Sequence, residues 1–376
     1  MEVNDKQTLA RSNDFITKKG IFMNLVLKKM RGFAVGLLST VFLLPVAACG
    51  GPDSSAVDSG TEGKIEKLSD TDFAQGLSVS GLQSGNVSRT WWKYQGKADA
   101  RVQPYWELGQ YCDLSSTRFR KNADGTDAWR YDSSRNDLTL GTLFDEGYGI
   151  EGTEENYETL TNQSGSKKVK VDRSSGEIQL DVDTSKEYLN EAGQISPRVS
   201  GEDWVHLILG QSAGGLRVTE WSEIWVELDF TLTKTNILSE EGGASQFQWI
   251  FSVKDKESVI GDYFWFNLTL YDNRYPVFEG TQMYDGGKAD STGKFIYAPP
   301  SSKLYEGSIE TGKAYKIRLN IRPLLQEAFD IAKEKGALEE SKFESMALNS
   351  LNIGWEVTNV AEVGVKISHL SLNVKK

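Results

Sequence analysis

Strict alternation of apolar and polar residues recurs throughout the second half of the chain. In residues 223–232, EIWVELDFTL, every second side chain is apolar, beginning with Ile224 and Val226. A period of two fits a β-strand with one buried face and does not fit a helix. The same alternation marks 203–211, 248–254, 263–272, 314–322 and 363–372. With 36 Gly and few long apolar runs, the chain is predicted to be all-β, a two-sheet jelly-roll sandwich.

One segment breaks this period. From Pro323 onward, Leu324, Leu325, Ala328 and Ile331 recur at helical spacing. Proline suits a first helical position, and Gly336 suits the end of a helix. The sequence therefore predicts a short helical insertion near residues 323–348. A change of phase at Ser368 and His369 predicts a β-bulge in the last strand.

The N-terminus has the pattern of an export signal. A basic stretch, KKMRG, precedes the apolar run from Phe33, which ends in Val46, Ala47, Ala48 and Cys49. This ending resembles a bacterial lipobox, in which the cysteine is lipidated and becomes the first residue. An ordinary signal peptide with a chance cysteine and an uncleaved anchor are the alternatives. We expect a lipid-anchored protein of the bacterial cell envelope, facing the periplasm or the outside.

Three regions follow from this interpretation. Residues 1–48 are predicted to be a signal peptide, and Met1 is expected to lie upstream of the true first residue of that peptide. Residues 49–70 are rich in Gly, Ser and Asp, and this composition predicts a flexible tether behind Cys49. Residues 71–376 are predicted to form the jelly-roll domain.

Charge and cysteine content exclude several classes of function. The net charge is −11, and residues 1–48 are basic, so the chain from Cys49 onward is more acidic still. Such a chain is not expected to bind nucleic acid. Once Cys49 is lipidated, Cys112 is the only thiol, which leaves no internal disulfide and no zinc site of several cysteines. With two His in the chain, we expect no metal site.

The segment DYFWFNLTLYDNR, residues 262–274, has two faces that are both unusual. Phe264, Phe266, Leu268 and Leu270 form an apolar face. The opposite face holds aromatic rings and small polar groups, where an ordinary strand would carry Lys, Glu or Ser. Its residues are Tyr263, Trp265, Asn267, Thr269 and Tyr271.

The successive strands EIWVELDF, QWIFSVK, YFWFNLTLYD and KAYKIRLNI, with the closing IGWEV and VGVKISHLSL, resemble the concanavalin A-like lectin and glucanase superfamily. The resemblance covers residues 200–376 and is one of pattern. It implies a curved jelly roll in which the concave sheet lines a groove for sugars. It also allows a structural calcium ion, although the loop Asn122 to Asp127 lacks the spacing of an EF-hand and is interpreted as a turn. No cofactor is expected.

If the alternating strands share one sheet, their outward faces combine into one ligand-binding surface. Aromatic rings, carboxylates, amides and cations on one surface suit a poly- or oligosaccharide. The predicted ligand-binding residues are Trp204, His206, Trp225, Glu227, Asp229, Tyr263, Trp265, Asn267, Tyr271, Lys316, Arg318 and Asn320.

Two enzymatic alternatives and a structural one remain open. Glu227 and Asp229 lie two apart, as in the Glu-x-Asp-x-x-Glu motif of laminarinase-type glucanases, but position 232 is Leu. A lyase acting on a uronate-containing glycan would need a His or Tyr base and a cation. His206, Tyr263, Tyr271 and Arg318 are the right residue types. A structural envelope protein without a sugar ligand is the third possibility.

Overall fold

The computed structural model describes residues 63–80, 89–92, 104–109, 149–162, 164–190, 192–198, 204–286 and 291–376. All of these lie in one compact unit, Gly51–Lys376. The signal segment, Cys49, Cys112 and the loop Asn122 to Asp127 lie outside the described residues. A search of the described ranges for a helix with the length and hydrophobicity of a membrane span finds none.

The chain folds into two packed β-sheets, so the predicted two-sheet sandwich is confirmed. In the first sheet, the order is β15 (Ala314–Asn320), β10 (Glu223–Ser239), β17 (Val360–Lys375), β8 (Glu177–Asp183), β7 (Lys167–Asp172), β6 (Tyr157–Asn162) and β5 (Gly149–Glu154). The short β1 (Ile65–Glu66) pairs with the end of β17.

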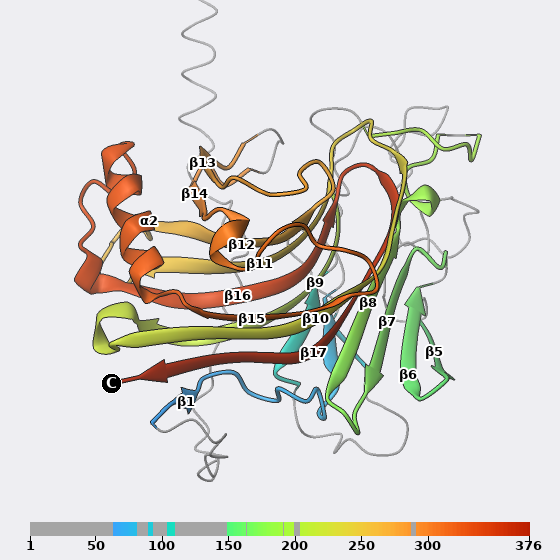
Figure 1. Cartoon of the computed structure of the whole chain (residues 1–376), viewed down its shortest axis with the longest axis horizontal. Helices are drawn as coiled ribbons and strands as arrows, with labels where there is room; N and C mark the ends of the chain where they lie inside the picture. The colour runs from blue at the N-terminus through green and yellow to red at the C-terminus, as the bar shows by residue number, and fades with distance from the viewer. Residues whose placement is uncertain are drawn as a thin grey trace, which may run out of the picture. The chain divides into compact units, whose positions relative to one another are not determined.

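In the second sheet, the order is β13 (Thr281–Tyr284), β14 (Phe295–Ala298), β12 (Tyr263–Asp272), β11 (Ser245–Asp255), β16 (Met346–Val357), β9 (Val205–Arg217), β4 (Trp106–Gly109), β2 (Leu77–Ser80) and β3 (Arg89–Trp92). The long strands of both sheets bend in the same direction, with β11, β12 and β16 inside the bend and β10 and β17 outside it (Figure 1).

The alternation of apolar and polar residues explains which side chains form the core between the sheets. Ile224, Val226 and Leu228 of β10 are fully buried, as are Phe264 and Phe266 of β12. Both sets lie on the inward faces predicted from the sequence. The predicted bulge is also confirmed, because Asp229 pairs with His369 and Phe230 with Ile367, which leaves Ser368 as the extra residue.

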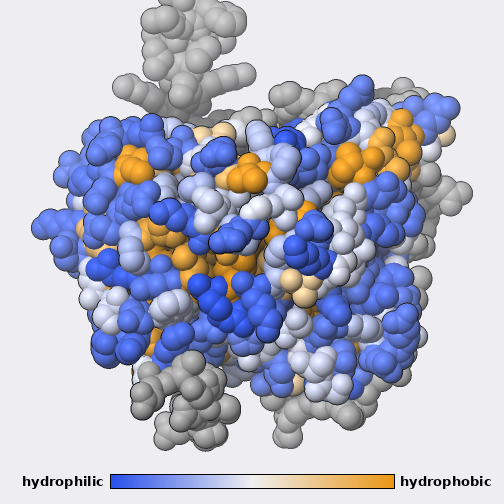
Figure 2. All heavy atoms as spheres, in the orientation of Figure 1, coloured by the Kyte–Doolittle hydropathy of each residue, from blue (hydrophilic) through white to orange (hydrophobic). Residues whose placement is uncertain are grey.

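Helix α2 (Arg322–Glu334) is the predicted helical excursion, with Pro323 in its first turn. Leu324, Leu325, Ala328, Phe329 and Ala332 are buried along one side. The α-helix itself ends at Glu334, before the predicted limit near residue 348. After the short 3-10 turn η4 (Phe343–Ser345), β16 already begins at Met346, because residues 346–348 pair with β9 and β11. The surface that faces the viewer in the orientation of Figure 1 is mostly hydrophilic, with apolar side chains gathered in separate areas (Figure 2).

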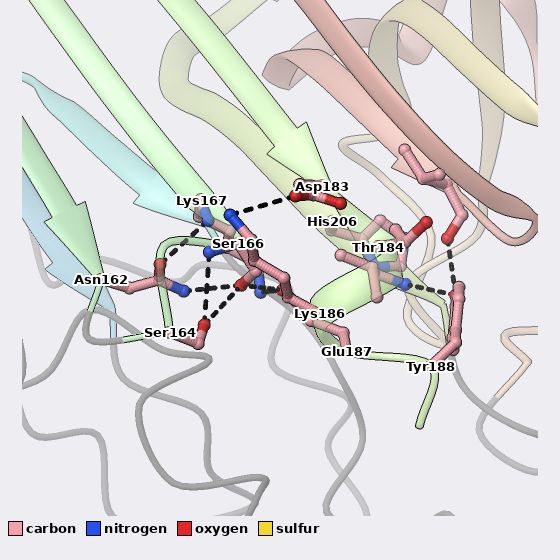
Figure 3. A network of polar contacts seen from close by, with 12 residues as sticks. Asn162, Ser164, Ser166, Lys167, Asp183, Thr184, Lys186, Glu187, Tyr188 and His206 are labelled. Carbon is pink, nitrogen blue, oxygen red and sulfur yellow. Dashed lines mark hydrogen bonds and ion pairs between the residues drawn. The ribbon is translucent and has the colours of Figure 1, made fainter. Parts of the chain in front are cut away.

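A buried polar network joins the first sheet to β9 and β16 (Figure 3). Lys167 at the start of β7 forms a short ion pair with Glu187, which also accepts a hydrogen bond of 2.6 Å from Ser166 Oγ. Two residues after the 3-10 turn η1 (Thr184–Lys186), the Tyr188 hydroxyl donates to Val357 O at 2.6 Å and accepts from Val205 N at 3.3 Å. Tyr188 therefore fixes the relative position of β9 and β16 next to His206 and Glu356.

The loop after β1 contains a carboxyl group with an unusual pKa. Burial raises the pKa of Asp70 to about 6; the hydrogen bond from Gln75 N lowers it, and neighbouring Asp72 raises it. Asp70 also has a positive φ of 55°, a conformation that asparagine tolerates. Its carbonyl oxygen accepts a hydrogen bond of 2.8 Å from Trp106 Nε1, so the loop is tied to the core.

We expect Asp70→Asn to change how stability depends on pH. Between about pH 4, where an unfolded Asp loses its proton, and pH 6, the folded protein retains the proton. The free energy of unfolding therefore falls as the pH rises through this window, by about 1–2 kcal/mol after allowing for solvent screening. Denaturant titrations from pH 4 to pH 7 should show a flatter profile for Asp70→Asn, and equal slopes in both proteins would contradict the assignment.

Candidate functional site

The predicted ligand-binding residues divide between two sheets, so the single surface expected from the sequence is wrong. Trp225, Glu227, Asp229, Lys316, Arg318 and Asn320 lie on β10 and β15 of the first sheet. His206, Tyr263, Trp265 and Asn267 lie on β9 and β12 of the second sheet, and Trp204 directly precedes β9. The outward faces of a sandwich point away from each other, so these two groups cannot contact one ligand.

On the first sheet, the charged residues neutralise one another. Arg318 lies opposite Glu227 in the register and pairs with Glu227 Oε2 at 3.3 Å and with Asp229 Oδ1 at 2.6 Å. Lys64 Nζ lies 2.9 Å from Glu227 Oε1 and 4.3 Å from the centre of the Trp225 ring. Burial tends to raise the pKa of Glu227, but Lys64, Arg318 and His369 outweigh it and hold that pKa below its usual value.

These contacts do not suit a glycosidase. One carboxyl group of such an enzyme must be protonated to act as the acid, and the lowered pKa of Glu227 opposes that role for it. Of the other first-sheet candidates, Lys316 is exposed and lies 3.5 Å from Asp229. Asn320 Oδ1 accepts hydrogen bonds from Ile224 N and Arg322 N and so holds the start of α2.

On the second sheet, Tyr271 does not share the outward face predicted for it. Tyr271 pairs with the buried Phe247, and its ring meets Trp355 of the core edge-on at 6.1 Å. The cause is a bulge in β12, because Thr269 pairs with Gln248 and Tyr271 with Phe247, which leaves Leu270 as an extra residue that shifts the phase by one. Tyr271 therefore points toward the core.

The outward side chains of β9, β16, β11 and β12 form what we call the polar face. Its centre is a chain of hydrogen bonds across all four strands. Gln248 Nε2 donates to Glu356 Oε2 at 3.0 Å, and Gln248 Oε1 accepts from Asn267 Nδ2 at 3.4 Å and Thr269 Oγ1 at 3.5 Å. Glu356 Oε1 lies 3.4 Å from His206 Nε2. Among the described residues, Asn267 Oδ1 has no hydrogen-bond partner.

His206 and Glu356 lie side by side in this chain of contacts. His206 Nδ1 is 2.9 Å from the carbonyl oxygen of Trp204, and because a carbonyl only accepts, Nδ1 is the donor in this contact. His206 Nε2 faces Glu356 Oε1, and the two form an ion pair whenever the ring is protonated. An imidazole beside a carboxylate is a pair of residue types that general acid–base catalysis uses.

Burial distinguishes the centre of the polar face from its margin. His206 and Asn267 are only 6% and 9% exposed, and Gln248 and Thr269 are buried as well. The face is therefore not a wide open groove. Its partly exposed members are Trp204, Gln246, Asn352, Glu356 and Trp265.

Two aromatic residues predicted to line a groove are packed against a neighbouring hairpin. Trp265 Nε1 donates to Thr292 Oγ1 at 3.3 Å, and its ring meets Tyr263 edge-on at 5.2 Å. Lys294 Nζ lies 5.2 Å from the centre of the Tyr263 ring. Burial raises the pKa of Tyr263, which opposes its use as an ionised base. The residues predicted for a lyase are therefore not brought together, because Arg318 lies on the other sheet and Tyr271 points toward the core.

The sequence contained a signal for Gln248, a member of the polar face that was not predicted. It precedes Trp249 in the alternation of β11 and so had to point outward. Within the ranges that the structure describes, no three His, Cys, Asp or Glu side chains gather as a metal ion would require.

No model of a known protein family and no curated protein matches the chain. Several solved structures are similar to it. A family 12 xyloglucanase from Bacillus licheniformis matches at 12% identity over 60% of this chain and 96% of its own, with a TM-score of 0.34. A family 11 xylanase from Neocallimastix patriciarum matches at 9% identity over 63% and 98%, with a TM-score of 0.35.

The catalytic domain of Cel12A from Humicola grisea, with a soaked thio cellotetraose, matches at 12% identity over 62% of this chain and 98% of its own, with a TM-score of 0.33. All three are jelly-roll glycoside hydrolases. At these identities and TM-scores, the similarity assigns neither a substrate nor an activity to this chain. The fold class follows from the two sheets themselves.

Proposed function

We propose that the chain binds a poly- or oligosaccharide on the polar face, as a lipid-anchored protein of the bacterial cell envelope held by Cys49. The observation that supports this is the strip of partly exposed Trp204, Asn352, Glu356 and Trp265 over a hydrogen-bonded base. Indole rings offer flat apolar surfaces to the C–H faces of sugars, and fixed amides and carboxylates pair with hydroxyls. Because Gln248 already holds Glu356 in place, little side-chain entropy is lost on binding.

A glycan-processing enzyme is the second candidate, and the contact of His206 Nε2 with Glu356 Oε1 at 3.4 Å favours it. An acid that can give up and take back a proton is the minimum for glycosidic cleavage or for proton abstraction beside a uronate. The site for this chemistry would be Glu356 with His206, and not Glu227 with Asp229. Product analysis after incubation with each glycan that binds separates the two candidates.

Glu356→Gln is expected to weaken glycan binding by about 1–3 kcal/mol, the worth of a hydrogen bond to a charged group. Glu362→Gln on the first sheet is the matched control, because Glu362 is also partly exposed and is also held by a neighbouring side chain, Lys234, at 2.8 Å. A glycan array with the whole chain selects the ligand, and calorimetric titration measures both variants. Equal affinities for Glu356→Gln and Glu362→Gln, with both proteins folded, would place the sugar elsewhere.

A further inference from the structure

The turn between β11 and β12 presents two adjacent apolar side chains to solvent. Val259 is 101% exposed and Ile260 is 78% exposed, the highest values among the large apolar residues that the structure describes. Turns normally place Gly, Asn, Asp or Ser at such positions. Two neighbouring branched apolar residues at the tip of a turn therefore point to a contact outside this chain.

The base of this turn is ordered by hydrogen bonds. Asp255 Oδ1 accepts from Glu257 N at 2.8 Å and from Ser258 N at 3.2 Å. On the other side, Asp262 N donates to Ser258 Oγ at 3.1 Å, and Gly261 has a φ of +74°. The two apolar side chains thus project from a fixed support, and burying them in a partner would order little further chain.

The turn lies at the end of the sandwich where the N-terminal segment joins it. Lys254 pairs with Ala347, which pairs with Arg217 at the end of β9. Arg217 is followed by the 3-10 turn η2 (Val218–Glu220) and the start of β10, where Glu223 pairs with Lys375. Ile65 of β1 pairs with Val374, so the chain before it leaves from the same end, where Figure 1 also shows the C-terminus.

Two lysines beside the turn favour an anionic surface. Arg217 and Lys294 are already paired, with Glu257 and Asp262 respectively. Lys254 and Lys256 flank the turn on the side of β11, and Asp255 between them is buried beneath it. These two lysines are the cations that the turn can offer to a partner.

We infer that this end of the sandwich docks on a phospholipid surface, with Val259 and Ile260 inserted among the head groups. The 13 residues between Cys49 and Gly63 can span at most about 50 Å, so a lipid on Cys49 would keep this end near the membrane. Apolar side chains in the interface, cations beside anionic lipid and a covalent lipid are the signals that together give stable membrane attachment. The long strands then run away from the membrane, and the polar face lies on a side of the molecule that faces neither lipid nor the tether.

The docking does not depend on sugar binding, and a depth measurement tests it. The test uses a Cys112→Ser chain that carries one new cysteine, Ile260→Cys, Leu238→Cys or Val277→Cys, to which a fluorophore is attached. The chain is placed in vesicles of phosphatidylethanolamine and phosphatidylglycerol that contain nitroxide-labelled lipid. Quenching of the fluorescence by the nitroxide is then measured for each position. Leu238, close to the end of β10, and Val277, in the segment after β12, are exposed controls away from the turn. Labelling of the Cys112→Ser parent gives the background.

We expect quenching at position 260 to exceed quenching at positions 238 and 277 several-fold, and Val259→Ser to reduce it. Equal quenching at the three positions, or none at 260, would overturn the inference. Shielding of the 260 probe in vesicle-free solution by a dimer of the chain would also overturn it, because the turn would then contact a second copy.

Discussion

Phe266→Ala is expected to lower the free energy of unfolding by about 3–5 kcal/mol. The ring is fully buried between Phe251, at 6.2 Å, and Tyr297, against which it stacks at 5.9 Å. Removing it leaves a cavity between two rings held by separate strands, and neither can move in to fill it. Chemical denaturation of the two proteins measures the difference.

Trp265→Ala is the matched comparison, because Trp265 is the next residue and points to the polar face. Its contacts are one hydrogen bond to Thr292 and the edge of Tyr263, so a loss of about 1–2 kcal/mol is expected. If sugar lies on the polar face, this variant also loses glycan affinity while Phe266→Ala, where folded, retains it. Equal destabilisation by the two variants would show that both faces of β12 contribute alike to the core.

Lys167→Met is expected to cost about 3–5 kcal/mol, because it leaves the Glu187 carboxylate buried without its cation. Both side chains of this pair are shielded from water, at 0% and 4% exposed. The double variant Lys167→Met/Glu187→Leu should recover most of the loss, since a buried pair can be replaced by apolar residues at little cost.

Lys234→Met is the control for the loss of a lysine from an ion pair. Lys234 and Glu362 are joined at 2.8 Å with side chains 56% and 31% exposed, and such pairs contribute less than about 1 kcal/mol. The double variant Lys167→Met/Glu187→Leu could instead prove as unstable as Lys167→Met. That result would show that the contacts of Asn162, Ser166 and Tyr188 stabilise this polar network, and that the unpaired charge does not cause the loss.

The core of the sandwich could be predicted because burial depends on a local period. Ile224, Val226 and Leu228 alternate with polar residues, and the same holds for Phe264 and Phe266, so each strand indicates its own buried side. The extra residue at Ser368 was visible for the same reason. Tyr271 was assigned to the wrong face because Leu270 is the extra residue of a bulge, and the alternation of apolar and polar residues in β12 continues through it without a visible break.

The candidate site could be predicted only in part, because it depends on which strands are neighbours. Nothing in the period of β10 indicates that it pairs with β17 and β15 and not with β9. Glu227 and His206 therefore looked equally suited to one surface, although they lie on opposite outer faces. The partners of His206, namely Glu356 and the carbonyl of Trp204, come from strand pairing across 150 residues and from a local turn.

The attachment of β1 determines how the domain would carry a mechanical load. Ile65 and Glu66 pair with Val374 and Asn373, and Lys67 N donates to Leu372 O at 2.8 Å. Tension from a membrane anchor that pulls along the axis of β1 would act on these hydrogen bonds in shear, all at once. It would pass into β17, which pairs with β10 on one side and β8 on the other. Force exerted by a bound polymer would thus be distributed over the middle of the first sheet and not concentrated on an edge strand that could peel away.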